Sequence, residues 1–345
     1  MKFTQIGLKA LVLSTAALIA APALAEAEFK FTLHHFLGPQ SNAHKDMLVP
    51  WAESIEKASD GRIDIEVYPS MSLGGAPPQL FRQAVDGVAD IIWMVNGYTP
   101  GLFPRTEVFE LPGVVTHDIA AANLAMSDLF DQYLAEEYKG VKVLWLHVHA
   151  GNGLHMAGKK VTSLADFKGL SLRSPGPSSN AVIEALGATP VSMPVPDLPQ
   201  SLATNHVQGG MIPWEIIPAL QLQQSTDYQI EGPNEARFSG TAYQVSMNQD
   251  SWDSLPPDLQ QIILDNTGPD FLKKVADIWR KSDDDALALA VADGNEHVVI
   301  EQAAWDEIKA ALDPVDQKWI ADNAGTFDAQ ALYDAAKAAI AAHSK

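Results

Sequence analysis

The chain of 345 residues contains no cysteine, which excludes disulfides, thiolate metal sites and cysteine nucleophiles. Basic residues are also scarce: 23 Lys and Arg face 43 Asp and Glu, for a formal net charge of −20. This surplus of negative charge repels phosphate backbones, so we expect no nucleic-acid partner. After the first 25 residues no apolar run reaches the roughly 18–20 residues of a membrane span, so we expect a chain that does not span the membrane.

The first 25 residues have the pattern of a secretory signal peptide. A basic start through Lys9 precedes the apolar run 10–21, which is too short to span a bilayer. The small-x-small sequence from Ala23 to Ala25 then predicts cleavage before Glu26. A secreted chain without disulfides depends on its core for stability, which fits a bacterial periplasmic protein.

Strand and helix patterns alternate along most of the chain. The stretches 29–36 and 62–68 alternate apolar and polar residues as strands do, and the apolar run 90–95 suits a strand covered on both faces. Helical spacing lies between them, at 43–58 and 79–86. The same order recurs, with strands at 141–149, 170–173, 189–193 and 209–212 and helices at 178–186 and 196–205. This alternation predicts an α/β fold with helices packed on mostly parallel sheets.

We therefore expect two α/β lobes of similar build, with the chain crossing between them near 120–150 and 210–250. Lobe I would comprise 26–150 with part of 235–270, and lobe II 151–235. The last part, 236–345, would supply hinge strands and C-terminal helices that pack on both lobes. The helices expected there are 257–266, 269–293, 303–312, 315–323 and 328–342. We interpret the run from Asp283 to Asp285 as a solvated helix face.

Arg173 is the most informative charged residue. It ends the predicted strand 170–173 and precedes a Ser-Pro-Gly-Pro turn. Ligands of open α/β sheets bind beyond the carboxyl ends of the strands. A guanidinium there can bind a carboxylate or sulfonate through two parallel hydrogen bonds. The alternative is an ion pair with one of the many acidic residues.

Three histidines, His147, His149 and His155, resemble a metal site. The first two share one face of a predicted strand, a spacing that zinc sites use together with a third His. No Asp or Glu lies between Trp145 and Lys160 to complete the set, so a structural role is favoured.

Other enzyme signatures are missing. The chain has no G-x-S-x-G, no P-loop and no G-x-G-x-x-G after a strand. Two weaker candidates remain for ligand binding. Asn152 sits in a Gly-Asn-Gly loop after a strand, where a ligand could approach closely or where the chain only turns. Trp214 lies at a strand-to-helix junction, where it would wall a pocket or fill the core.

Three segments carry a family resemblance. They are Pro69–Gly75 with Phe81–Asp90, Leu164–Pro175 including Arg173, and Met247–Gln260. In this order and spacing they resemble the dicarboxylate-binding, DctP-type solute-binding proteins of tripartite ATP-independent periplasmic (TRAP) transporters. The resemblance runs over nearly all of the mature chain.

The resemblance implies a periplasmic binding protein-like fold, with two α/β lobes, hinge strands and a long C-terminal connecting helix. It implies a periplasmic protein, not an enzyme, that uses no cofactor and closes on a small organic anion. That anion would be a carboxylate, such as a keto acid or aromatic acid, or a sulfonate, and it would pass to the TRAP membrane permease subunits. The strand-end arginine of the family binds the ligand carboxylate, and here that residue is Arg173.

The match has one departure at the site. Ile212 stands where many relatives carry an asparagine that contacts the ligand, and Trp214-Glu215 follow. A similar Trp-Glu pair lies near a bound cation in one keto-acid-binding branch, which makes Glu215 a candidate cation ligand; otherwise we expect no metal. The expected binding residues are His35, Phe36, Gln40, Asn96 and Tyr98 on one lobe, and Asn152, Arg173, Met211, Trp214, Glu215 and Tyr243 on the other lobe and hinge. So many aromatic residues suit a ligand with an apolar, ring or quaternary-ammonium part.

Two other functions remain open on the sequence alone. The signal peptide and two lobes also fit the binding protein of an ATP-driven importer. A secreted enzyme that uses the three histidines as metal ligands is the other alternative. Neither the ligand, the oligomeric state nor an added role in signalling to a sensor follows from the sequence.

Overall fold

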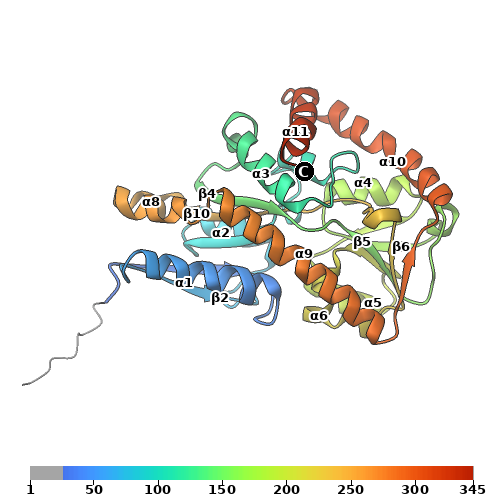
Figure 1. Ribbon diagram of the computed structural model, residues 1–345, viewed down its shortest axis with the longest axis horizontal. Helices are drawn as coiled ribbons and strands as arrows, with labels where there is room; N and C mark the ends of the chain where they lie inside the picture. The colour runs from blue at the N-terminus through green and yellow to red at the C-terminus, as the bar shows by residue number, and fades with distance from the viewer. Residues whose placement is uncertain (1–25, 345) are drawn as a thin grey trace, which may run out of the picture.

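A computed structural model describes residues 26–344, so the predicted signal peptide lies outside the described residues. The chain forms two mixed sheets with helices on their faces, which confirms the predicted two-lobed α/β fold (Figure 1). The seven strands predicted from the sequence are all present, each within two residues of its expected ends. Four more strands complete the sheets: β5, β9, β10 and β11.

The first sheet has the strand order β2-β1-β3-β10-β4. Its bounds are β1 Phe29–His35, β2 Ile63–Tyr68, β3 Ile91–Val95, β4 Val141–Val148 and β10 Ala242–Asn248. The first three strands run parallel, and β10 is antiparallel to both of its neighbours. All five residues of β3 are buried, as its continuous apolar run predicts.

The second sheet has the strand order β11-β9-β5-β8-β6-β7. Its bounds are β5 Gly153–Met156, β6 Ser171–Ser174, β7 Thr189–Ser192, β8 Gly209–Ile212, β9 Tyr228–Glu231 and β11 Glu296–Val299. Strand β5 is antiparallel to both neighbours, while β6, β7 and β8 are parallel. The parallel strands β6, β7 and β8 therefore have their carboxyl ends on one side of the sheet, where a ligand can approach β6.

Two chain segments cross between the sheets. The outgoing crossing, residues 149–152, leads from β4 to β5, and the return crossing, residues 232–241, leads from β9 to β10. They run side by side, because Asn152 and Ser239 form an antiparallel bridge in which the Asn152 N–H donates to the Ser239 carbonyl over 2.7 Å. The two crossings together provide the strands of a hinge.

The helices that precede β10 cover the sheets. They are α1 Val49–Ala58, α2 Leu80–Val85, α3 Ile119–Leu129, α4 Pro177–Ala185, α5 Leu198–Ala203 and α6 Ile217–Leu220. Sequence patterns did not predict α3, although Asp118 caps it by accepting a hydrogen bond from the Ala121 N–H. A π-helical turn, Ala43–Leu48, leads into α1, and Pro50 lies in the first turn of that helix, where a missing N–H costs little.

The C-terminal third is helical, with α7 Gln249–Asp253, α8 Pro257–Asp265, α9 Pro269–Ala292, α10 Gln302–Asn323 and α11 Ala329–His343. Helix α9 is the expected long connecting helix, and it crosses the molecule diagonally from the first sheet to the second (Figure 1). The expected break near Pro314 is wrong: α10 continues through this proline, with Leu312 and Val315 buried in the core of the second sheet. Packing on both sides of the proline offsets the lost hydrogen bond.

Candidate binding cavity between the lobes

A small cavity lies where the two sheets face each other. The first-sheet side contributes Phe36, Leu37, Val95, Tyr98 and Tyr243, and the second-sheet side contributes Arg173, Pro175, Val195, Ile212, Pro213, Glu215 and Ile216; Asn152 and Thr241 come from the crossings. The volume is about 20 Å³, roughly the space of one water molecule. A larger ligand therefore fits only if the lobes separate from this arrangement, both to let it enter and to make room for it.

Arg173 lies in this cavity at the end of β6 and is 2% exposed. Its Nε donates to the Met193 carbonyl (3.0 Å), and its Nη1 donates to the Met211 carbonyl (3.2 Å). Among residues 26–344 no carboxylate forms an ion pair with it. Burial lowers the pKa of the guanidinium from its ordinary value, while the neighbouring Tyr98 raises it. A charge this deeply buried favours an anionic partner.

Tyr98 links the two lobes at the arginine. It follows β3 of the first sheet, and its hydroxyl accepts hydrogen bonds from Arg173 Nη2 (3.3 Å) and from the Val195 N–H (2.9 Å) of the second lobe. Each Nη atom of Arg173 thus keeps one N–H that no bond above uses. Those two donors can bind both oxygens of one carboxylate.

Aromatic rings form the first-sheet wall of the cavity. Phe36 stacks on Trp93, with 4.9 Å between ring centroids and 4° between ring planes, and Trp93 stacks on Tyr243 at 5.2 Å and 2°. His147 continues the row against Tyr243 at 4.8 Å. These rings stack face to face, which makes the row rigid, and Phe36 and Tyr243 are its members that line the cavity. Such a surface suits a planar ring.

Glu215 lies across the cavity from this wall and is 5% exposed. Its Oε2 atom has no hydrogen-bond partner among the described residues. Burial raises the pKa of the carboxyl well above its ordinary value, and the nearby Asp283 raises it further. In its protonated form the carboxyl can donate a hydrogen bond to a ligand oxygen.

Asn152 reaches the cavity from the outgoing crossing. Its Nδ2 lies within hydrogen-bond distance of Ser239 Oγ (3.0 Å), the Gly240 carbonyl (2.9 Å) and Thr241 Oγ1 (3.1 Å). Its Oδ1 is buried without a partner among the described residues. The side chain therefore joins the two crossings and leaves one acceptor beside the cavity.

The structure thus brings together six of the residues singled out from the sequence: Phe36, Tyr98, Asn152, Arg173, Glu215 and Tyr243. The others lie elsewhere. Met211 packs in the second lobe, and only its carbonyl meets Arg173. Asn96 is bound to Tyr138 and Gln244, and His35 to His44. Gln40 is exposed on another hollow, which shares Glu215 with the cavity. The Trp214 ring packs on His155 at 4.6 Å, outside the cavity lining.

The three histidines considered as metal ligands have separate surroundings. His147 Nε2 accepts from the Trp93 indole (2.9 Å), His149 Nδ1 accepts from the Gly151 N–H (2.8 Å), and His155 Nε2 faces the Ile212 carbonyl (3.2 Å). Burial lowers the pKa of each to about 3. Within residues 26–344, no three His, Asp or Glu side chains are grouped to hold a metal ion.

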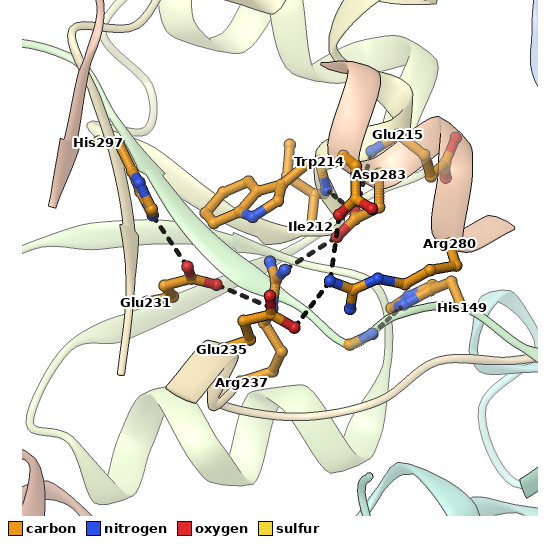
Figure 2. A network of polar contacts seen from close by, with 12 residues as sticks. His149, Ile212, Trp214, Glu215, Glu231, Glu235, Arg237, Arg280, Asp283 and His297 are labelled. Carbon is orange, nitrogen blue, oxygen red and sulfur yellow. Dashed lines mark hydrogen bonds and ion pairs between the residues drawn. The ribbon is translucent and has the colours of Figure 1, made fainter. Parts of the chain in front are cut away.

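Two residues near the site escaped the sequence analysis. Arg237 was not singled out, and Asp283 was expected on a solvated face. That expectation is wrong for Asp283, which is fully buried on α9 and paired with Arg237 at 2.8 Å, whereas Asp284 and Asp285 are exposed (Figure 2). The sequence signal for the burial of Asp283 was the run of acidic residues alone, because its partner Arg237 lies 46 residues earlier in the chain.

A buried arginine at a strand end, facing a cavity between two lobes joined by crossing strands, is the site of a two-lobed solute-binding protein. Comparison with known families narrows this class. The chain matches the model of the family described as bacterial extracellular solute-binding protein, family 7, over residues 33–323, and it belongs to that family. This confirms the resemblance found in the sequence. No helix between residues 26 and 344 combines the length and apolarity of a membrane span.

Curated and solved relatives agree with the assignment. The chain is 27% identical to the C4-dicarboxylate-binding periplasmic protein DctP of Rhodobacter capsulatus, covering 87% of this chain and 90% of that one. A TRAP solute-binding protein from a marine metagenome, described as specific for aromatic acids and solved with 3-hydroxybenzoate, is 33% identical with a TM-score of 0.89 (93% and 100% covered). One from Rhodoferax ferrireducens T118, solved with copurified benzoate, is 35% identical with a TM-score of 0.88 (91% and 98% covered).

Proposed function

We propose that this protein is the periplasmic subunit of a TRAP transporter that captures an aromatic monocarboxylate and delivers it to the membrane permease. The observation that carries the proposal is the Arg173 guanidinium, which is buried in the inter-lobe cavity without an acidic partner among residues 26–344. The ligand carboxylate would take the two N–H groups that remain on Nη1 and Nη2.

The walls favour an aromatic ring over a sugar acid or a short dicarboxylate. Phe36 and Tyr243 contribute aromatic rings to the lining, and the opposite lobe adds the aliphatic side chains of Val195, Ile212 and Ile216. Among the described lining residues no second cation accompanies Arg173, so a second carboxylate would be buried unpaired, at a cost of several kcal/mol. The relatives solved with 3-hydroxybenzoate and benzoate support the same ligand class.

Glu215 and Tyr243 extend the proposal to the ring substituent. Burial raises the pKa of the Tyr243 hydroxyl well above its ordinary value, so it stays protonated. Together with the Glu215 carboxyl in its protonated form, it offers hydrogen-bond donors at a second position in the lining besides Arg173. A ring hydroxyl in that position would satisfy both groups, so we propose that 3-hydroxybenzoate binds more tightly than benzoate.

A thermal-shift panel on the purified chain starting at Glu26 tests the ligand class. The panel compares benzoate, 3-hydroxybenzoate and mandelate with succinate, glucuronate and uncharged benzamide. A ligand that binds only the folded state raises the melting temperature with concentration, and at 100 times Kd it adds about 2.7 kcal/mol. We expect such a rise for the aromatic carboxylates alone. A rise only with succinate or glucuronate would refute the aromatic class, and an equal rise with benzamide would refute the role of Arg173.

A further inference from the structure

A buried network of charges lies directly behind the cavity wall (Figure 2). Arg237, on the return crossing, has a side chain that is only 4% exposed. Its Nη2 donates to Asp283 Oδ2 of α9 (2.8 Å), and its Nε lies 3.2 Å from Glu231 Oε2 of β9. The guanidinium also lies over the Trp214 ring, 4.6 Å from the centroid. One side chain thus contacts the crossing, the long helix and the second sheet.

The second oxygen of Asp283 holds the start of the cavity wall. Its Oδ1 accepts hydrogen bonds from the backbone N–H groups of Trp214 (2.8 Å) and Glu215 (3.3 Å). These two N–H groups open the short 3-10 turn Trp214–Ile216 and would otherwise be buried without partners. The carboxylate therefore fixes where this turn begins.

The anchored turn carries cavity residues. Glu215 and Ile216 lie in it, Pro213 and Ile212 precede it, and all four line the cavity opposite Phe36 and Tyr243. Trp214 points the other way, against Gly153, where an added Cβ would come within 2.1 Å of the indole ring. The turn is therefore held on two sides, by the packed indole ring and by the carboxylate that binds its backbone.

A contribution to folding stability alone does not explain a buried charge network of this kind well. Removing an arginine and a carboxylate from water costs several kcal/mol, and apolar residues of similar volume often serve a core equally well. Burial raises the pKa of Asp283 to about 6, even though Arg237 and the two N–H groups act in the opposite direction. The geometry offers a more specific role, because the charges bind the hinge crossing to the wall of the cavity.

We propose that Arg237 and Asp283 are positioning residues for the ligand site, which hold the Trp214–Ile216 turn at a fixed distance from Arg173 so that the wall is formed before the ligand arrives. The inference deepens the proposed function and rests on it. Neither side chain lines the inter-lobe cavity itself. A preformed wall raises affinity because binding then does not have to order the turn, and the free energy of binding carries no penalty for that ordering.

Calorimetry with benzoate and 3-hydroxybenzoate tests the proposal on Arg237→Gln, Asp283→Asn and the double variant. We expect each single variant to raise the dissociation constant about tenfold. The double variant should bind only slightly more weakly than the single variant with the larger effect, because the pair acts as a unit. Arg82→Gln is the control: Arg82 is exposed and pairs with Asp86 (2.5 Å), outside this network. Its affinity should stay within twofold of the wild type.

The ratio of the two dissociation constants separates positioning from a general loss of stability. If the Trp214–Ile216 turn is loosened, Glu215 is less well placed to bind the ring hydroxyl. The preference for 3-hydroxybenzoate over benzoate should therefore be smaller in Arg237→Gln. Global destabilisation lowers both affinities equally and leaves the ratio unchanged.

Arg237→Lys keeps the charge and one contact, so it should recover part of the affinity. An unchanged ratio, or full affinity in Arg237→Gln, would overturn the proposal.

Hydrogen–deuterium exchange without ligand keeps this inference separate from the proposed function. In Arg237→Gln the amides of residues 212–217 should exchange at least tenfold faster, with the peptides of β1 and β3 unchanged. If the wild type binds no aromatic acid, the proposed function fails, and the exchange rates still decide whether the network positions the turn. Unchanged exchange at 212–217 would overturn the inference even if aromatic acids bind.

Discussion

The Tyr98 hydroxyl of the first lobe accepts a hydrogen bond from Arg173 Nη2 of the second lobe over 3.3 Å. It also accepts the Val195 N–H, so its own proton is free to point into the cavity. A ligand carboxylate on Arg173 would receive that proton as a third hydrogen bond. The same hydroxyl therefore contacts Arg173 and the opposite lobe, so under the proposed function we expect it to couple ligand binding to lobe closure.

Replacing Tyr98 with Phe should weaken binding of the aromatic carboxylate. Hydrogen bonds to charged groups contribute about 1.5–3 kcal/mol, which corresponds to a roughly 10- to 100-fold higher dissociation constant. Calorimetry measures that change, and small-angle scattering with saturating ligand shows whether the closed form is less populated. A variant that binds and closes like the wild type would contradict the coupling.

The Glu110 carboxyl makes a second contact between the lobes. It accepts hydrogen bonds from Ser178 of α4 and from the Ala242 N–H (2.8 Å), and burial raises its pKa to about 7 against these bonds. The unfolded state ionises near 4.5, so the folded state holds the proton longer. Stability is therefore lost as pH rises from about 4.5 through 7, by about 1 kcal/mol between pH 6 and 8.

Urea unfolding of Glu110→Gln at pH 6, 7 and 8 measures this contribution. The amide is neutral at every pH and keeps both a donor and an acceptor, so the variant should lose less stability than the wild type on going to pH 8. Glu136→Gln is the control, because the Glu136 side chain is 64% exposed. Parallel pH profiles for Glu110→Gln and the wild type would show that Glu110 is ionised throughout.

Gly153 is required by the Trp214 ring. A Cβ at this position would come within 2.1 Å of the indole, so Gly153→Ala must displace the ring or the strand. We expect a loss of about 1–3 kcal/mol in the free energy of unfolding, as in other overpacked cores. Gly268→Ala is the control, because nothing lies within 4 Å of its added Cβ. Equal stability of the two variants would show that Trp214 is loosely held.

Much of the fold follows from local sequence patterns. The seven predicted strands have clear apolar runs or alternation that can be recognised locally. Strand β9 and β11 are short edge or near-edge elements with little alternation, and β10 was hidden within a stretch expected to form a crossing. The single helix α10 escaped because Pro314 normally ends a helix, and only tertiary packing shows that it does not.

The candidate site is harder to predict from the sequence than the fold is. Arg173 and Tyr98 follow strands whose ends can be placed, so their meeting in the cavity could be anticipated. Asn96 and His35 are also near strand ends, yet their polar atoms bind other side chains. Which way a side chain turns depends on partners far along the chain. The lobe boundaries given above and the ligand contacts stay predictions.

The most direct test of the central claim is a calorimetric titration of benzoate into the wild type and Arg173→Gln. Breaking a buried ion pair costs about 3–5 kcal/mol, so the variant should bind at least 100-fold more weakly. Arg82→Gln is the matched control, because Arg82 is exposed and pairs with Asp86 on α2. Unfolding curves verify that both variants are folded. One-to-one binding that Arg173→Gln abolishes and Arg82→Gln preserves is the predicted result; equal affinity of all three proteins for benzoate would contradict it.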